Sequence, residues 1–228
     1  MRPLDAILFD LGGTLDGRHG WRDRFHRLLP AAGIACSRDQ RAAAFDYAES
    51  RSHAEPAMAA SELRQMVTCH VGWQLEFLGR QPAGAAAQIV DAFIGDIYQA
   101  AAVNRPVLAQ LARCGFKLGV VSNGCGNTAG LCEEYGYADA LAVIVDSREF
   151  GAAKPDSSIF RHALSLIGCL PEQTAFVGDS LDRDIDPAKT LGMHTFWIAG
   201  RDVRLAQRAD AILESVADLP GALDRWSA

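Results

Sequence analysis

Five short apolar runs, each the length of a β-strand, constrain the fold of this chain more than any other feature of its sequence. The runs lack strict alternation of polar and apolar residues, which is typical of parallel strands buried on both faces. Most are followed by a Gly, Ser or Asp turn and then by a helical pattern, so the chain from about residue 105 onward is a βαβ series. We therefore predict an α/β fold with a five-stranded parallel sheet. The runs are Asp5–Phe9, Lys117–Val121, Ala142–Val145, Thr174–Val177 and His194–Ile198.

The stretch between the first two runs, residues 16–102, contains no convincing strand and instead has four helical patterns. A βαβ crossover needs only one helix, so four helices indicate a helical-bundle domain inserted after the first strand. We predict a core domain formed by residues 1–15 and 103–228, and an inserted domain at residues 16–102. The predicted helices are Trp21–Leu29, Ser37 to about Ser50, Ser61 to about Leu78, and Gly84–Ala101.

Composition and charge exclude several classes of partner. At 228 residues and 49% hydrophobic content, the chain is long enough for a sizeable core with a smaller inserted domain. Its net charge of −6, with 22 scattered Lys and Arg residues, provides no basic face, so no nucleic-acid partner is expected. No run approaches the roughly 18 apolar residues of a membrane span, and the first apolar stretch is too short for a signal peptide. Six cysteines without a CxxC pair indicate reduced thiols, and we expect a cytoplasmic protein without a membrane partner.

Polar residues follow the first two apolar runs, at the points where parallel strands would end. Asp10 comes directly after the first run and precedes a Gly-Gly-Thr turn. A carboxylate there faces the crevice in which such sheets bind ligands, although an Asp that only caps a turn fits equally well. Ser122, Asn123 and Gly124 end the second run and offer hydroxyl, amide and backbone N–H groups to phosphate oxygens. A simple polar turn is the alternative for this segment.

Two further loops carry charged residues. Lys154 lies in the loop at 151–156, where its ammonium can neutralise a phosphate and a carboxylate together, or can be an ordinary surface lysine. Asp179, Asp182 and Asp184 fall within six residues after the fourth run, where like charges repel unless a cation joins them. Oxygen ligands of this kind suit Mg²⁺, whereas a capping Asp in a solvated acidic turn is the competing explanation.

Taken in order, these four segments resemble the haloacid dehalogenase-like hydrolase superfamily, and the resemblance covers essentially the whole chain. The matching features are Asp10 after the first strand, Ser122 after the second, Lys154 before a proline, and the acidic loop at 178–184. The helical insertion resembles the cap domain of that superfamily. The resemblance implies a Rossmann-like core with a helical cap, and a hydrolase of the phosphatase-like branch.

The resemblance also implies a mechanism for a small phosphorylated substrate. Asp10 is expected to attack phosphorus in line and form an aspartyl-phosphate that water then hydrolyses. Lys154 is expected to offset the repulsion between the two anions. Ser122, Asn123 and Lys154 are expected to bind the phosphate, whose charge spreads over its oxygens in a loose transition state.

Mg²⁺ is the cofactor that the resemblance implies. Its expected protein ligands are the carboxylates of Asp10 and Asp179 and the backbone carbonyl of Gly12. Asp184 is expected to orient the groups that surround the metal. Together these assignments predict a Mg²⁺-dependent phosphatase.

Gly12 departs from the pattern of most phosphatases in the superfamily, which carry an acid/base aspartate two residues after the nucleophile. Glycine keeps the backbone carbonyl but loses a side chain that contributes roughly 10² to 10⁴ in rate. A good leaving group, or Asp16, His19 or His26, can compensate; otherwise the protein binds a phosphorylated ligand with weak or no catalysis. The Gly12-Gly13 pair also predicts a tight turn, in which a positive φ at Gly12 would strain an aspartate.

Two other chemistries of the superfamily fit this sequence less well. The phosphonate-cleaving branch needs a cap lysine for a Schiff base, and residues 16–102 contain no lysine. The dehalogenases use no metal and carry a Ser-Ser-Asn type loop where this chain has Gly178-Asp179-Ser180. The acidic loop therefore favours a metal, and hence phosphate chemistry.

Overall fold

The computed structural model describes residues 4–80, 83–198 and 206–227, and it is built around a parallel sheet. Within these residues the strand order is β3-β2-β1-β4-β5-β6. Phe9 of β1 pairs with Val120 of β2 and with Val177 of β4, so β1 is a central strand. Because all pairs are parallel, the carboxyl ends of the strands meet at one edge. The strands are β1 Ala6–Phe9, β2 Lys117–Ser122, β3 Val143–Asp146, β4 Thr174–Gly178, β5 His194–Ile198 and β6 Ala211–Leu213.

The predicted parallel α/β sheet is confirmed, but the predicted number of five strands is wrong by one. The sixth strand, β6, extends the sheet beyond β5, and Ala211 pairs with Phe196. This strand has only three residues, and only Leu213 is fully buried. A strand so short and so partly exposed lacks the long apolar run by which the other five were recognised.

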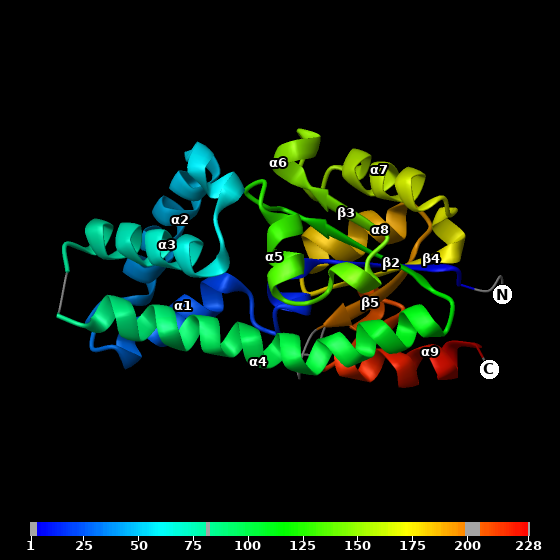
Figure 1. The fold of residues 1–228 in the computed structure, drawn as a ribbon, viewed down its shortest axis with the longest axis horizontal. Helices are drawn as coiled ribbons and strands as arrows, with labels where there is room; N and C mark the ends of the chain where they lie inside the picture. The colour runs from blue at the N-terminus through cyan, green and yellow to red at the C-terminus, as the bar shows by residue number, and fades with distance from the viewer. Residues whose placement is uncertain (1–3, 81–82, 199–205, 228) are drawn as a thin grey trace.

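Helices cover both faces of the sheet, as Figure 1 shows. Ile7 and Phe9 of β1 pack into a core with residues of α4, α5 and α9, whereas Ala6 and Leu8 point to the other face and pack with α7 and α8. This arrangement explains why the strand is apolar at every position. The helices of the core are α5 Thr128–Glu134, α6 Ser147–Phe150, α7 Ser157–Ile167, α8 Asp186–Thr190 and α9 Leu219–Ser227.

The insertion after β1 is helical, as predicted, and lies to one side of the sheet in Figure 1. Ser37 begins α2 with a reciprocal capping box to Gln40, which accounts for the predicted start of that helix. The helices of the insertion are α1 Trp21–Ala31, α2 Arg38–Ala54 and α3 Leu63–Leu78.

The longest helix, α4 Ala85–Arg113, belongs to both parts of the molecule (Figure 1). The sequence predicted its end near Ala101, but the helix continues because Leu108 and Leu111 are buried in the same core as the sheet residues. It therefore passes without interruption through the predicted domain boundary at 102/103, and that boundary stays a prediction. No helix in the described ranges combines the length and apolar character of a membrane span.

Candidate functional site

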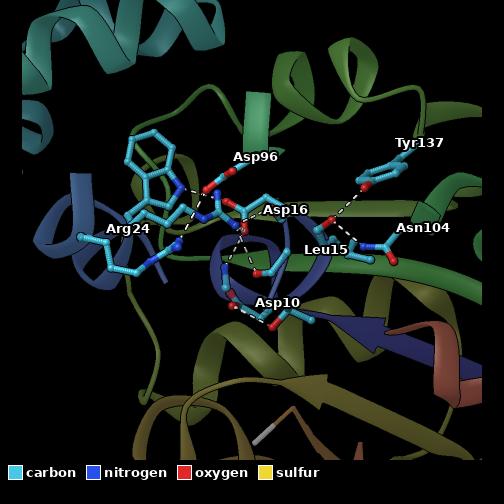
Figure 2. A network of polar contacts seen from close by, with 12 residues as sticks. Asp10, Leu15, Asp16, Arg24, Asp96, Asn104 and Tyr137 are labelled. Carbon is cyan, nitrogen blue, oxygen red and sulfur yellow. Dashed lines mark hydrogen bonds and ion pairs between the residues drawn. The ribbon is translucent and has the colours of Figure 1, made fainter. Parts of the chain in front are cut away.

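The loop after β1 places Asp10 at the carboxyl edge of the sheet and then turns back through the segment Leu11–Leu15. The turn depends on Gly13, which has φ of 92°, whereas Gly12 has φ of −77° and ψ of 111°. The positive φ considered for Gly12 thus belongs to its neighbour, and the expected tight turn is made by Gly13. Asn104 and Tyr137 both donate to the carbonyl oxygen of Leu15 over 2.8 Å, as Figure 2 shows. These two bonds fix the end of the loop.

Asp16 is buried beside this loop and acts as an acceptor for several donors. Its Oδ1 accepts from the backbone N–H of Gly13 at 2.6 Å, and its Oδ2 accepts from Trp21 Nε1 at 2.8 Å. Arg24, also buried, lies 3.3 Å from Oδ1 (Figure 2). Burial raises the pKa of Asp16, with Arg24 opposing the shift. With both oxygens accepting hydrogen bonds, this carboxylate holds the loop in place.

Lys154 joins the segments that follow strands β1 and β4 through its ammonium group. Its Nζ lies 2.6 Å from Asp10 Oδ1 and 2.7 Å from Asp184 Oδ1, and all three side chains are buried. The second oxygen of Asp184 accepts from the backbone N–H of Ser180 at 3.0 Å. The structure thus brings together Asp10, Lys154 and Asp184, which are far apart in the chain.

Asn123 positions the lysine through two reciprocal hydrogen bonds. Its Oδ1 accepts from the backbone N–H of Lys154 at 2.8 Å, and its Nδ2 donates to the Lys154 carbonyl at 2.9 Å. The amide predicted to bind phosphate is therefore occupied in holding the Lys154 loop. The bond to the Lys154 carbonyl uses one of the two Nδ2 hydrogens, and phosphate binding by Asn123 stays a prediction.

Asp179 completes a group of three carboxylates. Asp10, Asp179 and Asp184 each offer an oxygen, and these atoms lie within 4.8 Å of one another. Trp197 donates its indole N–H to the Asp179 carbonyl at 2.9 Å and so fixes the loop. The buried Oδ1 of Asp179 has no hydrogen-bond partner among the described residues. An unpartnered buried oxygen in a set of hard oxygen donors fits Mg²⁺.

Burial makes these carboxylates difficult to ionise without a cation. Burial raises the pKa of Asp10 to about 6, with Lys154 opposing the shift and Asp184 adding to it. Burial, followed by repulsion from Asp10 and Asp184, raises the pKa of Asp179 to about 8. Burial alone would lower the pKa of Lys154, but the attraction of the two carboxylates raises it. The ammonium therefore stays charged, and the cluster still has excess negative charge for a divalent ion.

A cavity of about 280 Å³ opens over this cluster. Of the predicted site residues, Asp10, Gly12, Ser122, Asn123, Lys154 and Asp184 line it. Asp179 enters the site through the carboxylate cluster instead. Among the proposed substitutes for the missing acid, Asp16 lines this cavity and His19 lines a second one.

Sequence reasoning missed Asp146, which anchors the loop after β2. The buried Asp146 carboxylate accepts from the backbone N–H of Gly126 at 3.0 Å and of Thr128 at 3.3 Å, and also from the Thr128 hydroxyl. Asp146 follows the third apolar run just as Asp10 follows the first, so inspecting every strand end would have found it.

Comparison with known proteins identifies relatives of this chain. Residues 4–192 match the family of haloacid dehalogenase-like hydrolases. A glyceraldehyde 3-phosphate phosphatase of Methanocaldococcus jannaschii is 34% identical over 118 residues, which is 49% of this chain and 51% of that protein. The chain thus spans about half the length of the curated relatives it matches first.

Solved structures of the same architecture cover nearly the whole chain. An L-2-haloacid dehalogenase superposes with a TM-score of 0.66 at 23% identity, covering 98% of this chain and 100% of the other. A Bacillus subtilis HAD-hydrolase, YfnB, whose structure was solved bound to magnesium, superposes with a TM-score of 0.61 at 18% identity, covering 98% and 100%. At these identities the likeness shows a shared fold. Since the family match spans well over half of its length, the chain belongs to the haloacid dehalogenase-like hydrolases.

Proposed function

We propose that this hydrolase is a Mg²⁺-dependent phosphatase of a small phosphorylated metabolite and that it works through an aspartyl-phosphate intermediate. The observation that carries the proposal is the buried cluster in which Lys154 bridges Asp10 and Asp184 beside the unpartnered oxygen of Asp179. The phosphatase relatives, similar over part of the chain, support the same reaction class.

The proposed division of labour follows from the geometry. Asp10 is the nucleophile. Among the described residues its Oδ2 has only a long contact of 3.4 Å to Thr14 Oγ1, so it is the freer oxygen for attack on phosphorus. Lys154 neutralises charge on the nucleophile and the transferring group. Ser122 and the backbone N–H groups of residues 123 and 124 bind the phosphate oxygens.

Mg²⁺ would be held by Asp10, Asp179 and the Gly12 carbonyl, with Asp184 orienting the surrounding groups through its bonds to Lys154 and Ser180. When bound, the ion supplies positive charge that offsets repulsion between the phosphate and the carboxylates. We further propose that residues 16–102 form a cap over the core made by residues 1–15 and 103–228. Trp21, Phe45 and Glu49 of this cap line the cavity above Asp10.

A dehalogenase is the other activity that the fold allows. A metal-independent dehalogenase has no need of the Asp179 carboxylate, which is buried here beside two others and has an unpartnered oxygen. Leaving that oxygen unsatisfied costs free energy unless a ligand uses it. The acidic cluster therefore favours the phosphatase.

A weakly active or non-catalytic protein that binds a phosphorylated ligand is the second candidate function. Gly12 favours it, because that position provides no acid for the leaving group. Asp16 does not replace the acid easily, since both of its oxygens accept hydrogen bonds from donors of the loop and cap.

Hydrolysis of an aryl phosphate, with and without Mg²⁺, separates these functions. We expect Mg²⁺-dependent turnover that is lost in Asp10→Asn and kept in Asp139→Asn, a matched change at an exposed aspartate. A wild-type protein that binds vanadate with Mg²⁺ but releases no phosphate would support the binding protein. Turnover that survives in Asp10→Asn would exclude the aspartyl-phosphate mechanism.

A further inference from the structure

Asn127 has a buried amide oxygen that no group in the described part of the protein satisfies. The residue is 4% exposed and lines the cavity above Asp10. Its Oδ1 has no hydrogen-bond partner among the described residues. A buried acceptor without a partner is rare in folded proteins and calls for an explanation.

The orientation of this amide is fixed by its neighbours in the insertion. Nδ2 donates to the carbonyl oxygen of Ser61 at 3.0 Å and contacts Met66 Sδ at 3.3 Å. A carbonyl oxygen only accepts hydrogen bonds, so the amide nitrogen must face Ser61. The unpartnered atom is therefore the oxygen, and a reversed amide would place two acceptors against each other.

The usual role of an asparagine at this position does not account for the free oxygen. Asn127 is the N-cap of α5, where an asparagine oxygen normally accepts a backbone N–H of the first helical turn. No such bond is formed here, and the side-chain amide faces Ser61 instead. The Asn127 oxygen is thus not used in capping, and it stays without a partner among the described residues beside the cavity.

The walls around this oxygen favour a ligand that donates hydrogen bonds. Glu49 lines the same cavity and adds carboxylate acceptor oxygens, which contacts with His70 at 3.4 Å and His53 at 3.5 Å hold in the cap. Two of the three cations that line the cavity are engaged by carboxylates, and the third, Arg183, contacts the Ser180 hydroxyl at 3.4 Å. Lys154 is bound by two carboxylates, and Arg22 is paired with Asp46.

We propose that Asn127 Oδ1 selects substrates whose leaving group carries a hydroxyl or ammonium donor, namely phosphate monoesters of polyols or amino alcohols. The proposal rests on the proposed phosphatase function and deepens it. The leaving group extends from the phosphate toward the insertion, and its donor satisfies the orphaned oxygen. The apolar walls formed by Trp21, Phe45, Met66 and Leu131 then cover its carbon atoms.

Three phosphate monoesters of similar size test the selection. Glycerol phosphate carries hydroxyl donors, 3-aminopropyl phosphate carries an ammonium, and butyl phosphate carries neither. For the wild-type protein we expect kcat/KM for at least one donor-bearing ester to exceed that for butyl phosphate by about tenfold or more, as for sites that hydrogen-bond a substrate group. The ester with the higher kcat/KM shows whether a hydroxyl or an ammonium group donates to Asn127 Oδ1. Equal values for all three would overturn the proposal without any variant.

Two matched variants locate the effect. Asn127→Leu should bring the preference down to about one. Gln74→Leu should keep both the preference and the activity, because Gln74 also has a buried amide oxygen without a partner among the described residues but is not one of the residues that line the cavity. If circular dichroism shows Asn127→Leu to be unfolded, Asn127→Ala replaces it. An unchanged preference in the folded Asn127 variant would overturn the assignment.

A binding measurement separates this proposal from the proposed function. Dissociation constants of glycerol phosphate, 3-aminopropyl phosphate and butyl phosphate for Asp10→Asn do not depend on turnover. If the wild-type protein hydrolyses no ester, the phosphatase fails, but tighter binding of a donor-bearing ester that is lost with Asn127→Leu would still support the acceptor role. Equal binding of all three would overturn it.

Discussion

A Cβ atom placed on Gly13 would lie 2.7 Å from Cγ of Asp179, so the Asp179 carboxylate occupies the space that a side chain at residue 13 would need. Gly13 also has a positive φ of 92°, which residues with a Cβ atom rarely adopt. The neighbouring Gly12 is different: its φ is negative, and a Cβ there would meet Trp21 Cδ1 at 3.8 Å, an ordinary contact. Backbone conformation and lack of space therefore require glycine at residue 13, whereas neither requires it at residue 12.

Gly12→Asp is expected to raise turnover on alkyl phosphates more than on aryl phosphates. A poor leaving group gains most from a positioned acid, and such acids contribute roughly 10² to 10⁴ in rate. The backbone at Gly12 accepts a side chain without strain, so the variant should fold. Steady-state kinetics on both ester classes, with Mg²⁺ affinity measured alongside, checks the expectation.

Gly13→Asp is the control for that substitution. It should disturb Asp179 and lose Mg²⁺ affinity, because the new side chain would displace the carboxylate beside it. If Gly12→Asp folds, binds Mg²⁺ as the wild type does and is no faster on alkyl phosphates, then the missing acid does not limit this site.

Asp179→Ala is expected to abolish Mg²⁺ binding measurable by calorimetric titration. The residue supplies the unpartnered oxygen of the carboxylate cluster. Asp182→Ala, in the same loop but exposed and paired with Arg208, should titrate like the wild type. Similar Mg²⁺ affinity in Asp179→Ala and the wild-type protein would remove this residue from the metal site.

Lys154→Ala is expected to weaken vanadate inhibition by roughly tenfold or more, since the variant loses a charge worth more in a buried site than in water. Vanadate should inhibit Lys117→Ala and Lys189→Ala as strongly as the wild type. The ammonium groups of these two lysines bind the Ile167 carbonyl and Asp210 instead. Thermal unfolding with Mg²⁺ present must accompany the assay, as removing Lys154 leaves Asp10 and Asp184 uncompensated. If the three variants have the same vanadate inhibition constant, Lys154 does not bind the phosphate group.

The strand ends were the most predictable part of the site. Asp10, Ser122 and Asp179 follow apolar runs, and a parallel sheet places all such ends at one edge. Lys154 was predicted because the resemblance placed a lysine in this loop. Its contacts with Asp10 and Asp184 depend on tertiary packing, which a single sequence does not display.

The contributions of the insertion were not predictable from sequence. Glu49 lies in α2, a helix with many polar residues, and the sequence does not distinguish the ones that line the cavity from the ones that face solvent. Asn127 looks like a normal N-cap, and only the structure shows that its side chain makes no cap bond and donates to the Ser61 carbonyl instead. The helix α4 runs past the expected boundary because one continuous core buries both its first half, as at Phe93, and its second half, as at Leu108.

His53 is expected to stabilise the protein in a pH-dependent way. Hydrogen bonding to Cys125 and then to Glu49 raises the pKa of His53 from 6.5 to about 10. A pKa raised in the folded state gives stability that is fully present below about pH 6.5 and is lost as the pH rises toward 10. Solvent screening of these half-exposed side chains limits the effect to about 0.5–1 kcal/mol.

Urea unfolding of the wild type, His53→Gln, Glu49→Gln and the double variant measures this coupling. The coupling energy between the two sites should be largest near pH 6 and should disappear by about pH 10. At pH 6 the imidazolium faces a carboxylate whose own pKa is lowered to about 2 by its bonds to His53 and His70, against the opposing effect of burial. Both partners are then charged, and deprotonation of His53 removes the attraction. A coupling that is the same at pH 6 and pH 10 would mean that His53 contributes by packing against the loop at Cys125 and not by its charge.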